Sequence, residues 1–310
     1  MNYVHKSVLL HESVEALQIK PDGVYVDGTL GGGGHSEEIA KRLNGGKLIC
    51  IDQDERAIER ASRRLEPYMD RITIVHGNFR ELGTILDRQQ VPHVDGMLFD
   101  LGVSSPQLDE TERGFSYMHD APLDMRMDET QSFTAREVVN EWPEERLRRI
   151  LFEYGEERYA ARIASAIVRR REERPIETTT ELSDLIRSAM PAAALREKQH
   201  PAKRSFQAIR IAVNDELDAL AEMLGVAADR LCLGGRLAVI SFHSLEDRIV
   251  KNAIVAREKG CTCPRDFPVC TCGFVQTLRS VTRKPIIASG EELEDNPRAR
   301  SAKLRVAERV

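Results

Sequence analysis

The sequence lacks the long apolar runs that a membrane protein requires. None of its apolar stretches approaches the ~20 consecutive residues with which a helix spans a bilayer. No secretory signal pattern stands among its first residues. Six cysteines in 310 residues do not suggest the disulfide framework of a small secreted domain. We therefore expect a cytoplasmic protein with no membrane partner.

An excess of either charge is also lacking. The 45 lysines and arginines nearly balance the 50 aspartates and glutamates, which leaves a formal net charge of −5. A protein coated by nucleic acid needs a strong positive excess, so any polynucleotide must be bound through local basic patches. No internal repeat or low-complexity tract is present. A chain of 310 residues is longer than one typical domain and suggests roughly two.

The most informative segment is residues 24–35. A short β-branched and aromatic run ends in Asp27, four consecutive glycines follow at 31–34, and an acid-rich helix opening begins at His35. A strand, a glycine turn and a helix in this order place backbone N–H groups beside a ligand. The dinucleotide fingerprint fits poorly because Ser36 stands where its third glycine belongs. The pattern D-x-x-x-G-x-G of S-adenosylmethionine-dependent methyltransferases fits better. A purely structural turn explains one or two glycines but hardly four in a row.

Acidic or polar residues follow three further predicted strands. The run 47–51 ends in Asp52, the run 72–75 leads through Asn78 to the aromatic Phe79, and the run 96–99 ends in Asp100. Asp52 lies about 20 residues after the glycine turn, where an acidic side chain accepts hydrogen bonds from a ribose. Phe79 is placed to pack on an adenine ring. One such aspartate is usually a turn residue, but four strand ends on one sheet edge favour a binding site.

The alternation of strand and helix stops after Pro106. Residues 107–204 show no convincing strand, and helical patterns over 144–154 and 157–171 predict an all-helical insertion. The capping boxes Thr134/Glu137 and Thr178/Glu181 and the charged loop 109–128 belong to it. A helix over 206–224, a strand over 236–241 and alternating runs at 274–278 and 304–309 follow, the last two as an antiparallel hairpin.

The predicted architecture is therefore an α/β protein of two parts. Residues 1–106 and 205–310 form a discontinuous domain with a Rossmann-like seven-stranded sheet, as in class I S-adenosylmethionine-dependent methyltransferases. Residues 107–204 form an inserted helical domain, to which we assign substrate recognition.

Several motifs together resemble a known family. They lie at residues 27–35, 100–109, 113–116, 122–128, 241–248 and 296–301. In order and spacing the chain is similar to the bacterial 16S ribosomal RNA cytosine-N4 methyltransferase family (RsmH or MraW type), essentially from Lys6 to Arg309. The resemblance implies methylation of the exocyclic N4 of a cytidine in the decoding centre of the small ribosomal subunit, with S-adenosylmethionine as cofactor. It leaves monomer and homodimer both open. The cofactor contacts that it implies are Gly33, Gly34, His35, Asp52, Phe79, Asp100 and Gln107.

The chemistry of an N4 amine can be weighed against the residues directly. Its lone pair is delocalised into the pyrimidine ring, so an enzyme must accept hydrogen bonds from the amine and aim nitrogen at the methyl group. Asp100, at the end of a strand, is a candidate for both tasks. The Pro-Pro motif common to amino-methyltransferases is absent, which leaves Asp100 between a cofactor role and a base-binding role. No Pro-Cys pair exists, which disfavours the covalent route of carbon-5 methylation.

Three further residues are candidates for the catalytic site. His243 follows the strand 236–241, and Ser244 is expected to cap the next helix with Asp247 at its third position. We interpret His243 as a positioner of the base, although a lone histidine is more often structural. Asp124 and Arg126 stand in the long loop. They belong either to a lid over a flipped base or to an ordinary solvated loop.

Basic residues and cysteines complete the candidates. Arg204, Arg210, Arg298 and Arg300 are expected to contact RNA phosphates, with a solvated surface as the alternative. Cys261, Cys263, Cys270 and Cys272 form two close pairs. Four thiolates at such spacing can hold a structural zinc ion, although pairs separated by two residues are commoner. A metal-free, reduced loop is an equal alternative.

Two other functions stand beside the expected one. A DNA amino-methyltransferase is the nearest enzymatic alternative, and the missing Pro-Pro motif counts against it. The other is a ribosome-assembly or RNA-binding protein with a catalytically idle methyltransferase fold. An idle site has no physical need for four glycines, nor for Asp52 and Asp100 beside them.

Overall fold

The computed structural model describes residues 6–264 and 271–310. The chain forms two compact units, the first made of residues up to Gly102 together with Leu217–Val310, the second of Val103–Glu216. The expected boundaries were 106/107 and 204/205. The second boundary differs because a helix that we assigned to the discontinuous domain packs in the second unit.

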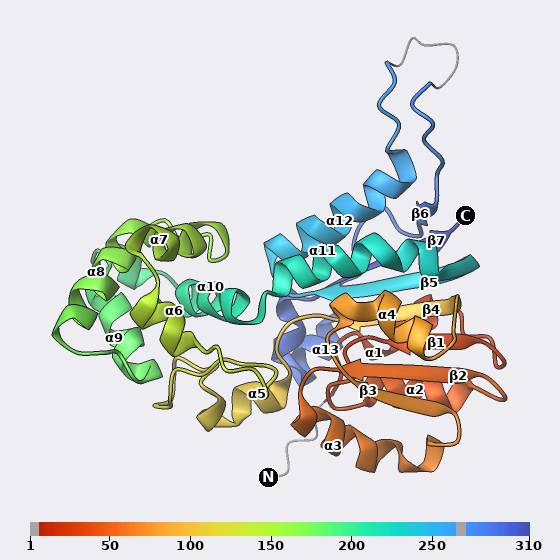
Figure 1. The fold of residues 1–310 in the computed structure, drawn as a ribbon, viewed down its shortest axis with the longest axis horizontal. Coiled ribbons are helices and arrows are strands. Elements are labelled where there is room, and N and C mark those ends of the chain that lie inside the picture. Colours follow the sequence, from red (N-terminus) through yellow and green to blue (C-terminus); the bar gives the residue numbers. More distant parts are fainter. Residues whose placement is uncertain (1–5, 265–270) are drawn as a thin grey trace. The chain divides into compact units, whose positions relative to one another are not determined.

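A seven-stranded sheet organises the first unit (Figure 1). Its order is β3-β2-β1-β4-β5-β7-β6. The strands β1 to β5 run parallel, and β7 pairs antiparallel with both β5 and β6. The bounds are β1 Val24–Asp27, β2 Lys47–Asp52, β3 Ile72–His76, β4 Val94–Asp100, β5 Leu231–Ser241, β6 Leu278–Ser280 and β7 Lys303–Arg309. This is the Rossmann-like sheet of class I methyltransferases, which confirms the predicted fold class.

Helices cover both faces of this sheet. Apolar side chains of α4 (Leu82–Arg88), α11 (Glu216–Ala227) and α12 (Ser244–Lys259) share one buried cluster with the sheet. Side chains of α1 (Leu10–Ala16), α2 (Gly34–Arg42) and α3 (Glu55–Leu65) share another, against which α13 (Gly290–Asp295) also packs. Coverage of both faces explains why a strand such as β2 reads as a continuous apolar run.

The second unit is helical, as predicted. It contains α5 Ser105–Asp109, α6 Ala135–Glu141, α7 Glu144–Glu153, α8 Ala160–Glu173, α9 Thr179–Ala189 and α10 Lys203–Asn214. A single isolated bridge, Pro122 to Thr178, is its only β pairing. Its own apolar core joins these helices to the segment around Met125.

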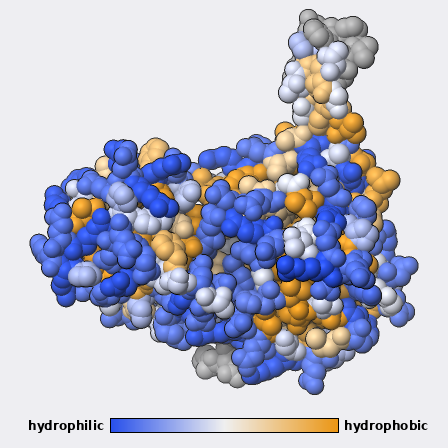
Figure 2. Space-filling view, in the orientation of Figure 1, coloured by the Kyte–Doolittle hydropathy of each residue, from blue (hydrophilic) through white to orange (hydrophobic). Residues whose placement is uncertain are grey.

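Three elements differ from the sequence-based prediction. The strand expected over 236–241 begins five residues earlier, at Leu231 in β5. The helix expected over 206–224 is two helices, α10 and α11, because Asp215 adopts a left-handed conformation with φ 51°. Aspartate is one of the few non-glycine residues that tolerate this region. The strand expected at 274–278 begins only at Leu278, in β6. No helix among the described residues is long and apolar enough to cross a membrane, and polar side chains cover most of the face seen in Figure 2.

Candidate active site

The glycine turn lies between β1 and α2. Gly31 and Gly33 have positive φ values of 51° and 75°, which side chains rarely adopt. At Gly34 a Cβ atom would stand 2.0 Å from Ser7 Oγ, so a larger residue cannot fit without movement. The glycines therefore shape a close backbone turn that leads directly into the first turn of α2.

Asp52 fastens this turn to the end of β2. Its Oδ2 accepts from the Gly31 N–H at 2.7 Å, and its Oδ1 accepts from the Asp54 N–H at 2.9 Å. Burial raises the pKa of Asp52 to about 6, although these backbone donors act in the opposite direction. A carboxylate oxygen can accept more than one hydrogen bond, so acceptor capacity is left for a ligand hydroxyl.

Asp27, at the end of β1, is buried behind the turn. Ser36 Oγ donates to its Oδ2 at 2.6 Å, and the Thr29 N–H donates to its Oδ1 at 3.2 Å. Burial raises the pKa of Asp27 to about 6, and the nearby Asp52 carboxylate adds to the shift. The sequence pattern included Asp27, but we assigned it no role.

Asp100 ends β4 on the same sheet edge. Its Oδ2 lies 3.9 Å from His35 Nδ1, and its Oδ1 is buried with no hydrogen-bond partner among the described residues. Burial raises the pKa of Asp100 well above its ordinary value, and the carboxylates of Asp27 and Glu246 add to this. His35 is held from its other side, where Nε2 lies 3.1 Å from the Val8 carbonyl.

Three carboxylates thus converge on one glycine turn. Asp27, Asp52 and Asp100 come from β1, β2 and β4, which are neighbours in the sheet. Each is partly or fully removed from water, and all three pKa values are raised. Buried carboxylates that lack enough donors favour a ligand that carries positive charge.

The two other predicted cofactor residues lie in different surroundings. Phe79 follows β3 and contacts Phe99 edge-on, with ring centroids 5.9 Å apart. Gln107 lies in the second unit, where its side chain and that of Ser104 form the capping box of α5. The structure therefore gathers Gly33, Gly34, His35, Asp52, Phe79 and Asp100 in the first unit, whereas Gln107 belongs to the second.

The cap of α12 differs from the one expected. We predicted Ser244 with Asp247, but His243 is the N-cap, and it forms a capping box with Glu246. His243 Nδ1 accepts from the Glu246 N–H at 3.4 Å, and Glu246 Oε2 accepts from the Phe242 N–H at 2.8 Å. Histidine is not among the residues preferred at this position, so the usual capping rule selected its neighbour.

Asp247 instead ties α12 to β7. It accepts from Lys303 Nζ at 3.2 Å and from Arg305 Nε at 2.6 Å. These ion pairs hold the start of α12 at the end of the sheet, and with it the ring of His243.

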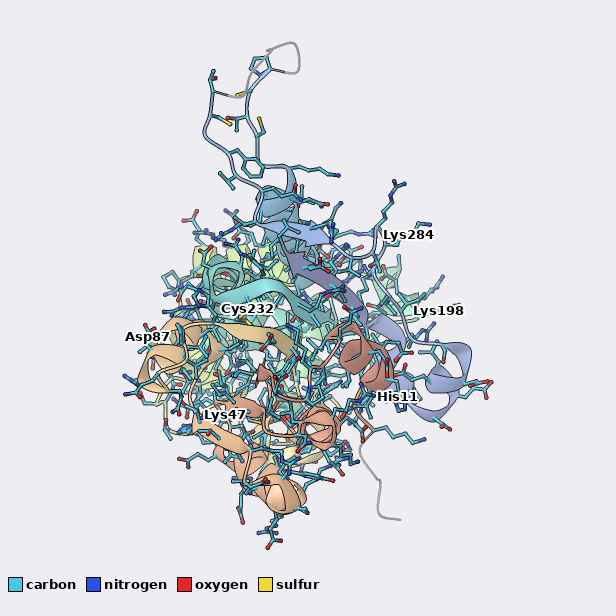
Figure 3. The ribbon with its side chains drawn as sticks, turned by 90° about the vertical axis from the view of Figure 1, so that its right-hand side faces the viewer. His11, Lys47, Asp87, Lys198, Cys232 and Lys284 are labelled. Atoms are coloured by element: carbon cyan, nitrogen blue, oxygen red, sulfur yellow. The ribbon has the colours of Figure 1, made fainter. Side chains whose placement is uncertain are left out.

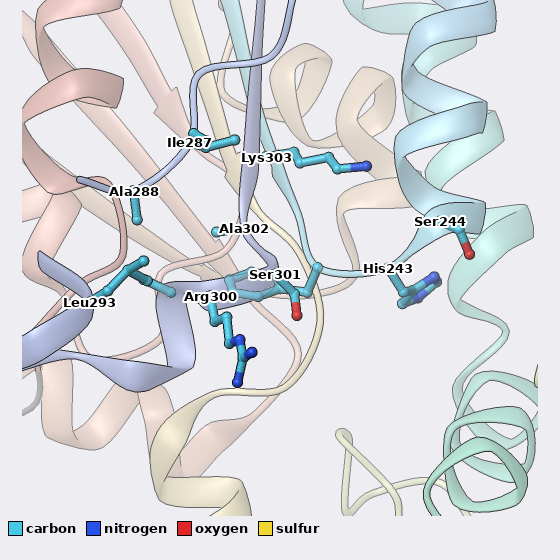
Figure 4. A pocket seen from close by; sticks show the side chains of 11 residues that line it. His243, Ser244, Ile287, Ala288, Leu293, Arg300, Ser301, Ala302 and Lys303 are labelled. Atoms are coloured by element: carbon cyan, nitrogen blue, oxygen red, sulfur yellow. The ribbon is translucent and has the colours of Figure 1, made fainter. Parts of the chain in front are cut away.

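A cavity of about 310 Å³ lies beside His243 (Figure 4). Its wall contains the cations Arg300 and Lys303 together with apolar side chains such as Ile287 and Leu293. Of the residues expected to contact RNA, Arg300 therefore shares a cavity with His243. Arg298 lies on the same short helical turn, Pro297–Ser301.

Asp124 and Arg126 form a close ion pair in the second unit. Arg126 Nε and Nη2 donate to the two oxygens of Asp124, each at 2.7 Å. Burial alone would raise the pKa of Asp124, but the hydrogen bonds from Arg126 lower it. Arg126 Nη1 also donates to the backbone carbonyls of Glu129 and Gln131. The pair therefore shapes its own loop.

The segment around this pair is not a solvated loop. Leu123, Met125 and Met127 are buried in the core of the second unit. Asn214 holds the segment by accepting from the Met127 N–H at 2.7 Å and donating to the Met125 carbonyl at 2.8 Å. The buried guanidinium of Arg113 donates to the Met127 carbonyl at 3.1 Å. The sequence pattern includes Arg113 in the motif 113–116 but gives no role to it or to Asn214, because long-range contacts to a loop backbone leave no periodic signal.

The other basic candidates differ in their surroundings. Arg210 is mostly buried. Its Nε and Nη2 donate to Oε1 and Oε2 of Glu216 at 2.8 and 2.9 Å, so the two residues form a structural ion pair. Arg204 is half-buried at the start of α10, in the second unit. Arg298 and Arg300 belong to the first unit, so the structure does not join all four in one unit.

Of the four predicted zinc ligands, Cys261, Cys263 and Cys272 are described, and their sulfur atoms all lie within 4.8 Å of one another. Cys270 lies outside the described residues. These three thiols stand beyond the far end of α12, apart from the acidic cluster.

Known proteins resemble this chain over its whole length. The family model described as the MraW methylase family matches residues 2–310. "Ribosomal RNA small subunit methyltransferase H" of Heliobacterium mobile is 57% identical, covering 100% of both chains. The proteins of the same name from Paenibacillus sp. (strain JDR-2) and Brevibacillus brevis are 57% and 56% identical, covering at least 99% of each chain. The chain therefore belongs to the MraW methylase family.

Proposed function

We propose that this protein transfers a methyl group from S-adenosylmethionine to the exocyclic N4 of a cytidine in 16S ribosomal RNA of the small ribosomal subunit. Relatives at 56–57% identity carry the name of a small-subunit ribosomal RNA methyltransferase. The atom that is methylated is inferred from the motifs that the chain shares with the cytosine-N4 family and from the chemistry of the site.

The convergence of Asp27, Asp52 and Asp100 on the glycine turn carries the proposal. The cofactor, when bound, supplies an electrophilic methyl group on a positively charged sulfur. Buried carboxylates with raised pKa values favour such a cation, because its charge replaces the solvation that burial has removed.

Individual residues fit the remaining parts of the cofactor. We assign Asp52 to accept hydrogen bonds from the ribose hydroxyls and Phe79 to pack on the adenine. We also assign the backbone of Gly33 and Gly34 to the cofactor. Glycine is needed there to close the turn, because a Cβ atom would meet Ala61 at Gly33 and Ser7 at Gly34. His35 lies beside Asp100, with its other ring nitrogen against the Val8 carbonyl.

Asp100 Oδ1 supplies the hydrogen-bond acceptor that the amine needs. It is buried and has no hydrogen-bond partner among the described residues, which costs free energy. An N–H donor from the substrate would supply the missing hydrogen bond and so offset this cost. Accepting from N4–H favours the tetrahedral nitrogen required for attack, and it aims the lone pair. His243, held by the cap of α12, positions the base and takes no proton in this scheme.

RNA is recognised through separate residues. We assign phosphate contacts to Arg298 and Arg300 in the first unit and to Arg204 in the second. Arg210 carries less weight because Glu216 already engages it. The segment shaped by Asp124 and Arg126 is assigned to hold the flipped base.

The decisive experiment is methyl transfer from labelled cofactor to small ribosomal subunits of a strain that lacks this protein. The digested RNA should contain label in N4-methylcytidine alone. Label in a carbon-5 or ribose-methylated nucleoside would refute the N4 assignment, and no label at all would refute catalysis. Naked RNA, run in parallel, tells whether the assembled subunit is required.

A further inference from the structure

Beyond the end of α12 the chain forms a narrow arm, with one leg at 260–264 and a returning leg at 271–277 (Figure 1). None of the described arm residues is buried, and Val275 is 74% exposed. The arm is a thin projection in Figure 2 as well. Since a segment without an apolar core cannot hold itself together, such segments are commonly fastened by disulfides or metal ions.

Sulfur atoms from both legs meet in this arm. Cys261 and Cys263 come from the outgoing leg and Cys272 from the returning leg, and their sulfur atoms all lie within 4.8 Å of one another. The Sγ atoms of Cys261 and Cys272 are 3.7 Å apart. A disulfide bond is far shorter, about 2.05 Å. Two thiolates on one tetrahedral zinc, each about 2.3 Å from the metal, stand about 3.8 Å apart.

The backbone of the returning leg supports the same arrangement. The Thr271 N–H donates to Cys263 Sγ at 3.2 Å. Amide donors of this kind offset the charge of a metal-bound thiolate and orient it. Gly273, directly after Cys272, has φ 70°, and a Cβ there would meet nothing within 4 Å. Glycine is therefore required by the backbone conformation, which turns the chain just after a cysteine.

We propose that Cys261, Cys263 and Cys272 bind one structural zinc ion that fastens the two legs of the arm. Thiolates select soft or borderline cations, and zinc commonly takes this role in small segments without a core. Each thiol loses its proton on binding, so that the sulfur binds as the thiolate. The fourth place of the tetrahedron belongs to a donor beyond these three residues.

The metal stands far from the acidic cluster. His243 caps the start of α12, and the arm begins after its end. A helix of 16 residues is about 24 Å long. The ion therefore acts on the arm alone, and its loss should leave cofactor binding intact.

Metal analysis of the full-length protein tests the proposal. Protein purified without chelators, then reconstituted with zinc in reducing buffer and desalted, should hold about one zinc per chain. The Cys261→Ser/Cys272→Ser double variant should hold none. Cys232→Ser is the matched control, since this half-buried cysteine lies on β5, labelled in Figure 3, and should leave zinc content unchanged. Wild-type protein without zinc, or a double variant that retains it, overturns the site.

Cobalt and limited proteolysis supply readouts other than zinc content. Cobalt(II) in place of zinc should give thiolate-to-metal charge-transfer absorption in wild type and in Cys232→Ser, but not in the double variant. Removing zinc should speed cleavage within 260–277 several-fold and leave cofactor affinity unchanged. Unchanged cleavage would overturn the fastening role. Intact cofactor binding by the double variant shows that its metal loss is local.

Discussion

At the scale of single residues, the candidate site is characterised by carboxylate groups that are buried away from solvent. A buried carboxylate raises the free energy of the folded protein unless donors or a cation replace the solvent. Asp27 has two donors and Asp52 has its backbone donors, whereas Asp100 Oδ1 has none among the described residues. We therefore propose that Asp27 contributes to ligand binding through its charge alone, Asp52 through its charge and its remaining acceptor capacity, and Asp100 through its Oδ1 atom.

Replacing Asp52 by alanine should weaken cofactor binding. A hydrogen bond to a charged group contributes roughly 1.5–3 kcal/mol, so affinity for S-adenosylmethionine should fall about 10- to 100-fold. Isothermal titration calorimetry measures this directly. Asp87→Ala removes a carboxylate of α4 that pairs with Arg230 on the surface; it is the control and should bind like wild type. Unchanged binding by Asp52→Ala would remove Asp52 from the site.

The preference for a cationic cofactor should depend on pH. Asp27 and Asp52 have folded-state pKa values of about 6. Below this they are mostly protonated, and above it they are ionised, so a cation gains attraction as pH rises through 6. S-adenosylhomocysteine lacks the sulfonium charge and serves as the neutral reference. The affinity ratio of the two should rise about tenfold between pH 5 and 7.5, or ~1.4 kcal/mol. A ratio that stays flat would show that these carboxylates do not sense the sulfonium.

At the scale of elements, helix caps and strand ends decide how much the sequence reveals. The strand ends at Asp27, Asp52 and Asp100 were predictable, because buried parallel strands are continuous apolar runs and polar residues mark where they stop. The His243 cap was not, since the ring nitrogen replaces the oxygen of the preferred capping residues. The break at Asp215 was hidden as well, because apolar periodicity continues across α10 and α11 while a single φ angle interrupts the helix.

Two substitutions distinguish the role of His243 as the cap of α12 from its proposed role in positioning the base. His243→Ala should destabilise the protein by ~0.5–2 kcal/mol through loss of the cap. His243→Asn keeps a capping acceptor but removes the ring, so it should unfold close to the wild-type temperature. If the ring aims the base, both variants should lower turnover at saturating RNA, with little change in the concentration for half-saturation. Wild-type turnover by His243→Asn would reduce His243 to a helix cap.

At the scale of the whole molecule, the roles that we propose are divided between the two units. The acidic cluster and the glycine turn belong entirely to the first unit, whereas the Asp124–Arg126 segment and Arg204 belong to the second. Each unit has its own apolar core. Sequence alone predicted this division because strand periodicity stops where the helical unit begins. The sequence did not predict where the chain returns from the helical unit to the first unit. The reason is that α10 is as amphipathic as a sheet-covering helix, and only tertiary contacts show which core it joins.

Binding of the small cofactor and binding of RNA should therefore be separable by mutation. Arg204→Ala and Arg300→Ala should each keep wild-type affinity for S-adenosylmethionine and weaken binding to small ribosomal subunits. Each lost phosphate contact should reduce the slope of log K against log salt by about one unit. Arg126→Ala is less informative, because it also breaks the ion pair that shapes its loop. Arg149→Ala removes an exposed charge of α7 paired with Glu153 and serves as the control, with an unchanged slope. If both test variants keep the wild-type slope and turnover, RNA binds to another surface, while the acidic cluster and its cofactor assignment stand unaffected.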